Sequence, residues 1–275
     1  QGEIGSCTSN AICQAIKMLS KDNFEPSRLW LYYKERTMET SNITDSGADA
    51  ADGLTYVAKY GIANEKDWPY IVSNVNIAPP IIADNNAHNY TISGLISLDR
   101  NPSYKNYATE MINSIKNTLV SGYPILIGIE VYSSFEHAKS GIIPYPNTTT
   151  ERLLGGHEIL ITGYDNSKSL FEFVNSWGST WGNKGFGYLP YSYVTDYNLT
   201  QEFRYFTKVY GASPPQTINQ NKIKEDVLLL KKSLKDMDMS KAITVITELL
   251  AFIKANNSVI TVMNNTLDDI VNNLN

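Results

Sequence analysis

The chain has 275 residues, of which 42% are hydrophobic, and its formal net charge is −5. This length allows one large domain with an appendage or two small domains, and the acidic balance argues against a nucleic-acid-binding face. No apolar run reaches the roughly 18 residues of a membrane span. The three histidines and two cysteines show no spacing typical of a metal site, so no metal or other cofactor is predicted.

The first predicted helix covers residues 6–20, where apolar side chains recur at helical spacing. Ser6 is placed to cap this helix, which puts Cys7 in its first turn. Because the positive end of a helix dipole stabilises an anion, this position favours the Cys7 thiolate. Cys13 lies on a different face, so a disulfide between the two cysteines is not expected.

The rest of the first 210 residues changes from helices to strands. Two helices are expected, from Pro26 onwards and over residues 48–60. Residues 62–103 are predicted to be rich in loops because they hold several prolines. A helix follows over residues 105–121. Strands are then predicted over residues 125–131, 158–164, 170–175, 186–189 and 203–210. This order indicates an α+β fold with a helical half and a sheet half.

The composition shifts after residue 210. Residues 211–221 read as a linker that contains two prolines. Over residues 222–275 apolar residues recur in steps of three and four, which predicts two or three amphipathic helices. These helices are expected to join copies of the chain or to bind a protein partner. The alternative is an intramolecular hairpin packed on residues 1–210.

Three separated segments supply the side chains for thiol chemistry. Cys7 can act as a nucleophile, and the amide of Gln1 can join the Cys7 backbone N–H as an oxyanion donor. His157 follows two glycines and can serve as the base, whereas His88 and His137 are expected on the surface. Asn175 ends the strand after that of His157 and can orient its ring, with Trp177 and Trp181 shielding the hydrogen bond.

Residues 1–210 resemble the papain-like cysteine peptidases. The resemblance is carried by Gln-Gly-x-x-Gly-Ser-Cys at residues 1–7, by Gly-Gly-His at 155–157 and by Asn-Ser-Trp-Gly at 175–178. It implies a two-subdomain fold, with a β-barrel-like sheet half and an active-site cleft between the halves. It also implies that a polypeptide substrate contacts Ser46, Gly47, Ala48, Gly156, Glu158 and Trp177, with Gly47 on the backbone edge that holds the extended chain.

Two departures from the family pattern are informative. Many members carry a disulfide between positions that hold Ile4 and Asp45 here. Its absence favours a reducing intracellular compartment or a virus particle over secretion. Glu158 replaces the small residue that usually follows the histidine, where it helps line the pocket for the side chain two before the cleaved bond. A carboxylate there would favour Arg or Lys, unless Glu158 points to the opposite face of its strand.

The main hypothesis is therefore a thiol endopeptidase that works through a Cys7 acyl-enzyme. One alternative is an exopeptidase or transpeptidase with the same residues. A second alternative is a scaffold protein that keeps the peptidase fold as a body for its helical tail. The complete set of Gln1, Cys7, His157 and Asn175 favours an enzyme, because a scaffold does not need these side chains.

Overall fold

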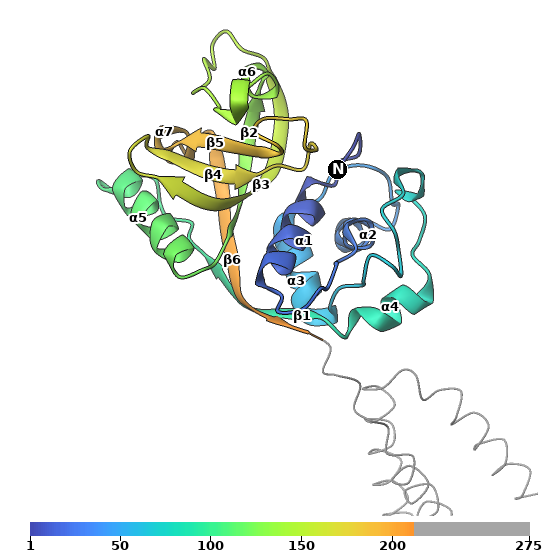
Figure 1. Ribbon diagram of the computed structural model, residues 1–275. Coiled ribbons are helices and arrows are strands. Elements are labelled where there is room, and N and C mark those ends of the chain that lie inside the picture. Colours follow the sequence, from blue (N-terminus) through green and yellow to red (C-terminus); the bar gives the residue numbers. More distant parts are fainter. Residues whose placement is uncertain (212–275) are drawn as a thin grey trace, which may run out of the picture. The chain divides into compact units, whose positions relative to one another are not determined.

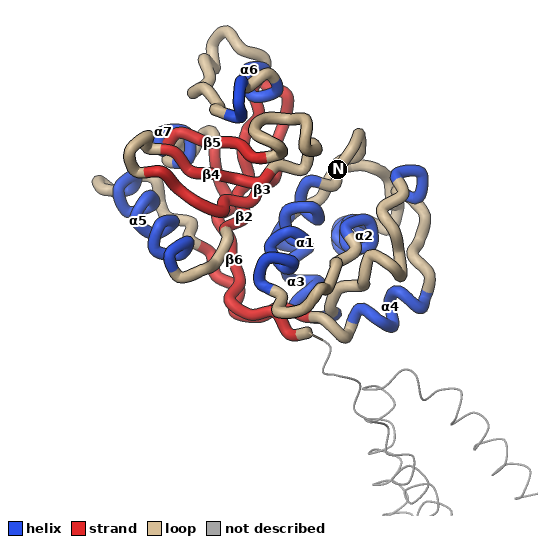
Figure 2. Tube along the Cα trace, viewed as in Figure 1, coloured by secondary structure: helices blue, strands red, loops and turns tan. Residues whose placement is uncertain are grey.

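The computed structural model describes residues 1–211, which form a helical half and a sheet half (Figure 1). The linker and helices predicted for residues 212–275 lie outside the described residues. The helices of residues 1–90 gather on one side, and most strands lie on the other together with the later helices (Figure 2). The predicted α+β arrangement is confirmed for the described part.

The helical half contains α1 (Cys7–Leu19), α2 (Arg28–Glu39), α3 (Ala50–Tyr60) and α4 (Ile81–Ala87). Local chemistry explains two of the starts. Ser27 Oγ accepts the Trp30 backbone N–H at the start of α2, and the Asp49 carboxylate accepts that of Ala51 at the start of α3. α3 ends at Gly61, whose φ of 86° suits glycine.

The sheet has six strands in the order β1-β6-β2-β3-β4-β5, and every neighbouring pair is antiparallel. The strands are β1 (Thr91–Ser97), β2 (Ile125–Tyr132), β3 (Leu153–Asp165), β4 (Leu170–Val174), β5 (Phe186–Pro190) and β6 (Thr200–Tyr210). α5 (Tyr107–Val120) contributes Met111 and Ile115 to the core of this half. Short helical turns complete it: α6 (Ser133–Glu136), η2 (Lys139–Gly141) and α7 (Tyr191–Val194).

The two halves share part of one apolar core. Ile12 and Ile16 of α1 cluster with Leu160 of β3 and with Leu126 and Phe206 of the neighbouring strands. Burying this apolar surface holds α1 against β3, which fixes the first residue of α1 opposite the middle of β3. The fold therefore positions Cys7 and His157 through one packed contact between a helix and a strand.

Residues 62–103 are rich in loops, as predicted, but they also include the 3₁₀ turn η1 (Val72–Asn74), α4 and β1, which were not predicted. The strand that carries His157 begins at Leu153 and not at residue 158, so His157 lies within β3. The glycines at 155 and 156 are part of this strand because they pair with Val131 and Glu130 of β2.

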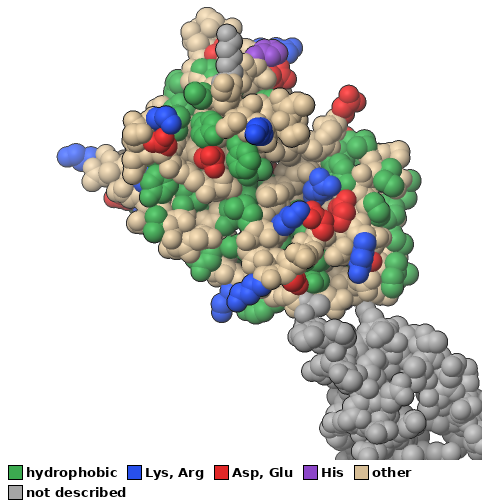
Figure 3. Space-filling model, in the orientation of Figure 1, with side chains coloured by type: hydrophobic (Ala, Val, Ile, Leu, Met, Phe, Trp, Pro, Cys, Tyr) green, Lys and Arg blue, Asp and Glu red, His purple; other side chains and the backbone are tan. Residues whose placement is uncertain are grey.

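No helix among residues 1–211 combines the length and the apolar character needed to cross a bilayer. On the face of residues 1–211 that Figure 3 shows, basic and acidic side chains are interspersed with hydrophobic ones.

Candidate active site

Hydrogen bonds of side chains hold the start of α1 in place, but Ser6 does not cap the helix with its own side chain. Ser6 Oγ instead lies 2.6 Å from the Tyr70 hydroxyl and accepts Asn10 Nδ2 at 3.0 Å. The Gly5 N–H donates to Asp45 Oδ1 at 2.9 Å, and this carboxylate also accepts the Tyr32 hydroxyl at 2.6 Å. Asp45 and Tyr32 thus tie the loop before Cys7 to the loop around Gly47.

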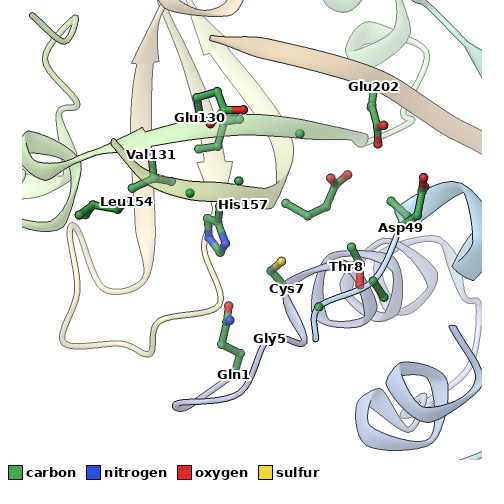
Figure 4. A pocket seen from close by; sticks show the side chains of 18 of the residues that line it. Gln1, Gly5, Cys7, Thr8, Asp49, Glu130, Val131, Leu154, His157 and Glu202 are labelled. Carbon is green, nitrogen blue, oxygen red and sulfur yellow. The ribbon is translucent and has the colours of Figure 1, made fainter. Parts of the chain in front are cut away.

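His157 is buried beside Asn175, and each residue is 7% exposed. His157 Nε2 lies 2.8 Å from Asn175 Oδ1, which also accepts the Ser176 backbone N–H at 2.8 Å. Because an atom that accepts a backbone N–H must be the amide oxygen, Nε2 carries the proton that binds it. Nδ1 is then the free base, and the imidazole and the Cys7 side chain point toward one another in Figure 4.

Aromatic rings cover the His157–Asn175 pair. The Trp177 ring lies 4.9 Å from the His157 ring, and Trp181 packs edge-on against Trp177 at 5.6 Å. Phe135 completes the group at 5.3 Å from Trp177. The shielding expected from Trp177 and Trp181 is therefore present.

Burial dominates the electrostatics of the reactive pair. Desolvation raises the pKa of the Cys7 thiol, and the nearby carboxyl groups of Glu158 and Glu35 act in the same direction. It also lowers the pKa of His157 to about 4, although the hydrogen bond that the imidazole donates to Asn175 opposes this shift. Burial therefore opposes the thiolate that the position at the helix start favours.

Gln1 lies beside the pair, with its side chain held on both ends. Its Nε2 donates to the Ile4 carbonyl at 2.9 Å, and its Oε1 accepts the Ser176 hydroxyl. The Tyr70 hydroxyl donates to the Gln1 carbonyl at 2.7 Å. Since the amide nitrogen has two hydrogens, one N–H remains for a further acceptor.

The cleft next to Cys7 is a cavity of about 950 Å³ that both halves line. Nine of the ten residues predicted for the site border it: Gln1, Cys7, Ser46, Gly47, Ala48, Gly156, His157, Glu158 and Trp177. Asn175 does not border this cavity and lies behind the His157 ring. The Gly47 N–H donates to the Tyr32 hydroxyl at 3.0 Å, so the amide of Gly47 is occupied within the protein.

Several residues of the site were not foreseen. Thr8 Oγ1 donates to Glu35 Oε2 at 2.8 Å, and Glu35 is fully buried below the cleft. Glu202 borders the cavity from β6 and has a φ of 62°. Residues 203–210 read as a regular strand, which gave no signal of an irregularity at Glu202. Among residues 1–211, no group of His, Cys, Asp or Glu side chains is arranged to hold a metal ion.

Comparisons with known proteins agree with this geometry. The profile of the papain family of cysteine proteases matches residues 1–207. An uncharacterised peptidase C1-like protein of Acanthamoeba polyphaga mimivirus is 36% identical over 240 residues, which cover 82% of this chain and 76% of that protein. "Peptidase 1" of Psoroptes ovis is 29% identical over 56% of this chain, and the match spans only 43% of its own length.

A solved structure is similar as well. The cysteine protease xylellain from Xylella fastidiosa is 32% identical and superposes with a TM-score of 0.68, covering 76% of this chain and 81% of that chain. The family match extends over most of the described residues. Within them, His157 and Asn175 are hydrogen-bonded as in a catalytic triad. This chain therefore belongs to the papain family of cysteine proteases.

Proposed function

We propose that this protease is an endopeptidase in which Cys7 is the nucleophile, His157 the base and acid, and Asn175 the residue that orients His157. The observation that carries the proposal is the bond from His157 Nε2 to Asn175 Oδ1. It leaves Nδ1 unprotonated on the side of the thiol. A base in this tautomer can take the thiol proton without any rearrangement of the ring.

The reaction begins when the proton of Cys7 Sγ moves to His157 Nδ1. Burial penalises either charge alone, but this step creates both charges together, and their attraction is strong in a desolvated site. The sulfur then attacks the peptide carbonyl and forms a tetrahedral oxyanion. The Cys7 backbone N–H and the remaining N–H of Gln1 Nε2 are proposed to stabilise that oxyanion.

The oxyanion collapses by breaking the C–N bond. His157 gives its proton to the leaving amine, and a thioester between Cys7 and the acyl group remains. A water molecule then loses a proton to His157 Nδ1 and attacks the thioester. The products are a carboxylic acid and the regenerated thiol, so the charges and protons balance over the cycle.

An extended substrate would lie along the cavity between the two halves. Ser46, Gly47 and Ala48 border one side, and Gly156, Glu158 and Trp177 border the other. Because the Gly47 N–H is already bound by Tyr32, the main chain of the substrate is proposed to pair with Ala48 and the Gly47 carbonyl.

The test uses the two cysteines as a matched pair. Purified protein is treated with a biotinylated epoxide selective for papain-like thiols, and the adduct is mapped by mass spectrometry. Label on Cys7 is expected in wild type and in Cys13→Ala, whereas Cys7→Ala should lose both label and hydrolysis. Peptidase activity that survives in Cys7→Ala would overturn the mechanism.

Endopeptidase and exopeptidase action are separated by the products. A peptide blocked at both ends should be cut internally by an endopeptidase and should resist an exopeptidase. Transfer of the acyl group to an added amine in place of water would indicate a transpeptidase. No hydrolysis or transfer at all, with Cys7 unlabelled, would favour the scaffold alternative.

We also propose that residues 222–275, which lie outside the described residues, bind a second copy or a protein partner. This rests on the apolar spacing in their sequence. The full chain should give the mass of an oligomer by light scattering, and truncation after Ala212 should reduce it to the mass of a monomer. A full chain that is itself monomeric would favour a hairpin within one chain, packed on residues 1–210.

A further inference from the structure

A second cavity lies on the sheet half, outside the catalytic cleft. It has a volume of about 580 Å³ and lies between the start of α5 and the turn that follows α7. Eight residues border this tyrosine cavity: Pro102, Tyr107, Tyr145, Ser192, Thr195, Asp196, Tyr197 and Asn198. None of them borders the cleft beside Cys7. The tyrosine cavity is therefore separate from the proposed peptidase site, although its size is ordinary for a small-molecule site.

Three of the eight lining residues are tyrosines that come from separate parts of the chain. Tyr107 lies at the start of α5, Tyr145 in the segment between η2 and β3, and Tyr197 between α7 and β6. Tyr145 and Tyr197 are each about half exposed, so neither ring is fully covered by other protein groups. The face of an aromatic ring is electron-rich and attracts cations. Several rings around one cavity therefore favour a positively charged ligand.

The charge of the lining has the sign that a cation needs. Asp196 is the one charged residue among the eight. Its Oδ2 accepts the Tyr145 hydroxyl at 2.5 Å, and its Oδ1 accepts the Asn198 backbone N–H at 2.9 Å and the Asn198 Nδ2 at 3.2 Å. All of these donors are neutral. They hold the carboxylate in place at the wall of the cavity without cancelling its charge.

The Tyr107 hydroxyl is a second and independent sign of a ligand. Tyr107 is only 8% exposed, and its hydroxyl forms no hydrogen bond with another group among residues 1–211. Since buried hydroxyl groups nearly always have a partner, a molecule in the cavity is expected to supply one. Burial raises the pKa of the Tyr107 hydroxyl, and the charges of Asp99 and Asp196 raise it further. The same carboxylates would stabilise a cation beside the Tyr107 ring.

The remaining polar groups favour a cation over a sugar. Thr195 Oγ1 donates to the Tyr191 carbonyl at 2.9 Å, and the Asn198 amide and the Tyr145 hydroxyl already donate to Asp196. A sugar needs several free donors and acceptors, which these groups do not offer. A quaternary ammonium has no N–H to donate and is held by ring faces and negative charge alone. No Lys or Arg borders the cavity, so the lining offers no partner for a phosphate next to the ammonium.

We propose that the tyrosine cavity binds the trimethylammonium group of a small molecule of the choline class. The rings of Tyr107, Tyr145 and Tyr197 would surround the cation, and Asp196 would supply the opposite charge. The Tyr107 oxygen would accept weak C–H contacts from the methyl groups, which carry part of the positive charge. This site is independent of the proposed peptidase function, because none of its residues takes part in that reaction.

The test compares choline with 3,3-dimethylbutan-1-ol, which has nearly the same shape but no charge. The full chain is prepared with carbon-13 in its tyrosine rings, and single Tyr→Phe variants assign the ring signals in NMR spectra. Choline should shift the signals of Tyr107, Tyr145 and Tyr197, with a Kd about tenfold or more below that of the uncharged alcohol. Equal Kd values, or shifts confined to other tyrosines, would refute the site.

Three variants locate the binding energy. Tyr197→Leu removes one ring, and Asp196→Asn removes the charge but keeps an oxygen that can accept the Tyr145 hydroxyl. Each should raise the Kd for choline about five- to tenfold. Tyr210→Leu is the matched control, because Tyr210 is 50% exposed, close to the 46% of Tyr197, but lies at the end of β6 and does not border the cavity. It should keep the wild-type Kd. An unchanged affinity in Tyr197→Leu or in Asp196→Asn would contradict the proposal.

Two other ligands separate choline from its nearest alternatives. Phosphocholine should bind more weakly than choline, because the Asp196 carboxylate repels its phosphate. Tighter binding of phosphocholine would overturn the proposal in favour of a site for lipid head groups. Methyl glucoside should leave the three tyrosine signals unchanged, and a response to it without one to choline would indicate a sugar site. No arm measures hydrolysis, so the result does not depend on whether the cleft acts as a peptidase.

Discussion

The effect of burial on His157 can be tested directly. Burial lowers its pKa to about 4, whereas imidazole in an unfolded chain titrates near 6.5. In Cys7→Ala the thiol can no longer act as a counter-charge, but the buried ring and its bond to Asn175 remain. We therefore expect the pKa of His157 to stay near 4 in this variant.

The shift has a consequence for stability, and its sign follows from proton counting. Between pH 4 and 6.5 the unfolded chain holds a proton on this imidazole and the folded protein does not. The free energy of unfolding therefore falls as the pH falls through this range, and the contribution is constant above it. A difference of about 2.5 pKa units corresponds to roughly 3 kcal/mol of stability lost by pH 4.

The assay combines NMR titration with urea unfolding. His157→Gln in the Cys7→Ala background assigns the imidazole signal of His157 and removes its contribution to stability. The difference in unfolding free energy between pH 7 and pH 4 should be about 3 kcal/mol larger with His157 present. A pKa at or above 6.5 in Cys7→Ala would refute burial as the dominant effect. A higher pKa in wild type than in Cys7→Ala would measure stabilisation by the thiolate.

Three other predictions follow. Asn175→Ala should lower kcat/KM about 10- to 100-fold, because it removes a hydrogen bond to imidazolium, and Asn175→Asp should recover part of the loss. Burial raises the pKa of the Glu35 carboxyl, so this group lowers the stability of the folded protein as the pH rises above 4.5. Glu35→Gln should therefore raise the free energy of unfolding at pH 7, which urea midpoints at pH 4 and pH 7 can check. Iodoacetamide should inactivate by alkylating Cys7 and spare buried Cys13, whereas EDTA should have no effect on activity.

The helices and the reactive residues were predictable because their signals are local. α1, α3 and α5 show apolar side chains at helical spacing, and each was expected within three residues of its observed ends. The segments around Cys7, His157 and Asn175 combine residue types that thiol chemistry needs. The residues that identify each reactive side chain therefore lie within a few positions of it in the sequence.

Other features depend on partners far along the chain. Most residues of β1 are exposed, and its sequence lacks the apolar alternation typical of a strand. β1 forms because it pairs with β6, whose residues lie more than 100 positions later in the chain. The Ser6 hydroxyl forms a hydrogen bond with the Tyr70 hydroxyl, so it does not cap the helix as its local sequence predicts. The bulge at Glu202 arises from the register between β2 and β6, which no local pattern encodes.

The proposed substrate edge can be tested with two glycines of similar φ. Gly47 borders the cavity with a φ of 81°, and Gly122 follows α5 with a φ of 88°. A methyl group at either position would meet no described protein atom within 4 Å. Each alanine substitution should therefore cost a similar amount of stability, about 1–2 kcal/mol, because only the backbone strain changes.

Their effects on activity should differ, because the space around Gly47 is where the substrate main chain is expected. Gly47→Ala should lower kcat/KM by about tenfold, the size of one lost or displaced main-chain contact, whereas Gly122→Ala should retain wild-type kinetics at a temperature where both are folded. Matched urea midpoints establish that strain is equal. A methyl group in the path of the substrate would displace the substrate main chain and lower kcat/KM. If Gly47→Ala and Gly122→Ala then cleave peptides at the same rate, the substrate does not run along residues 46–48.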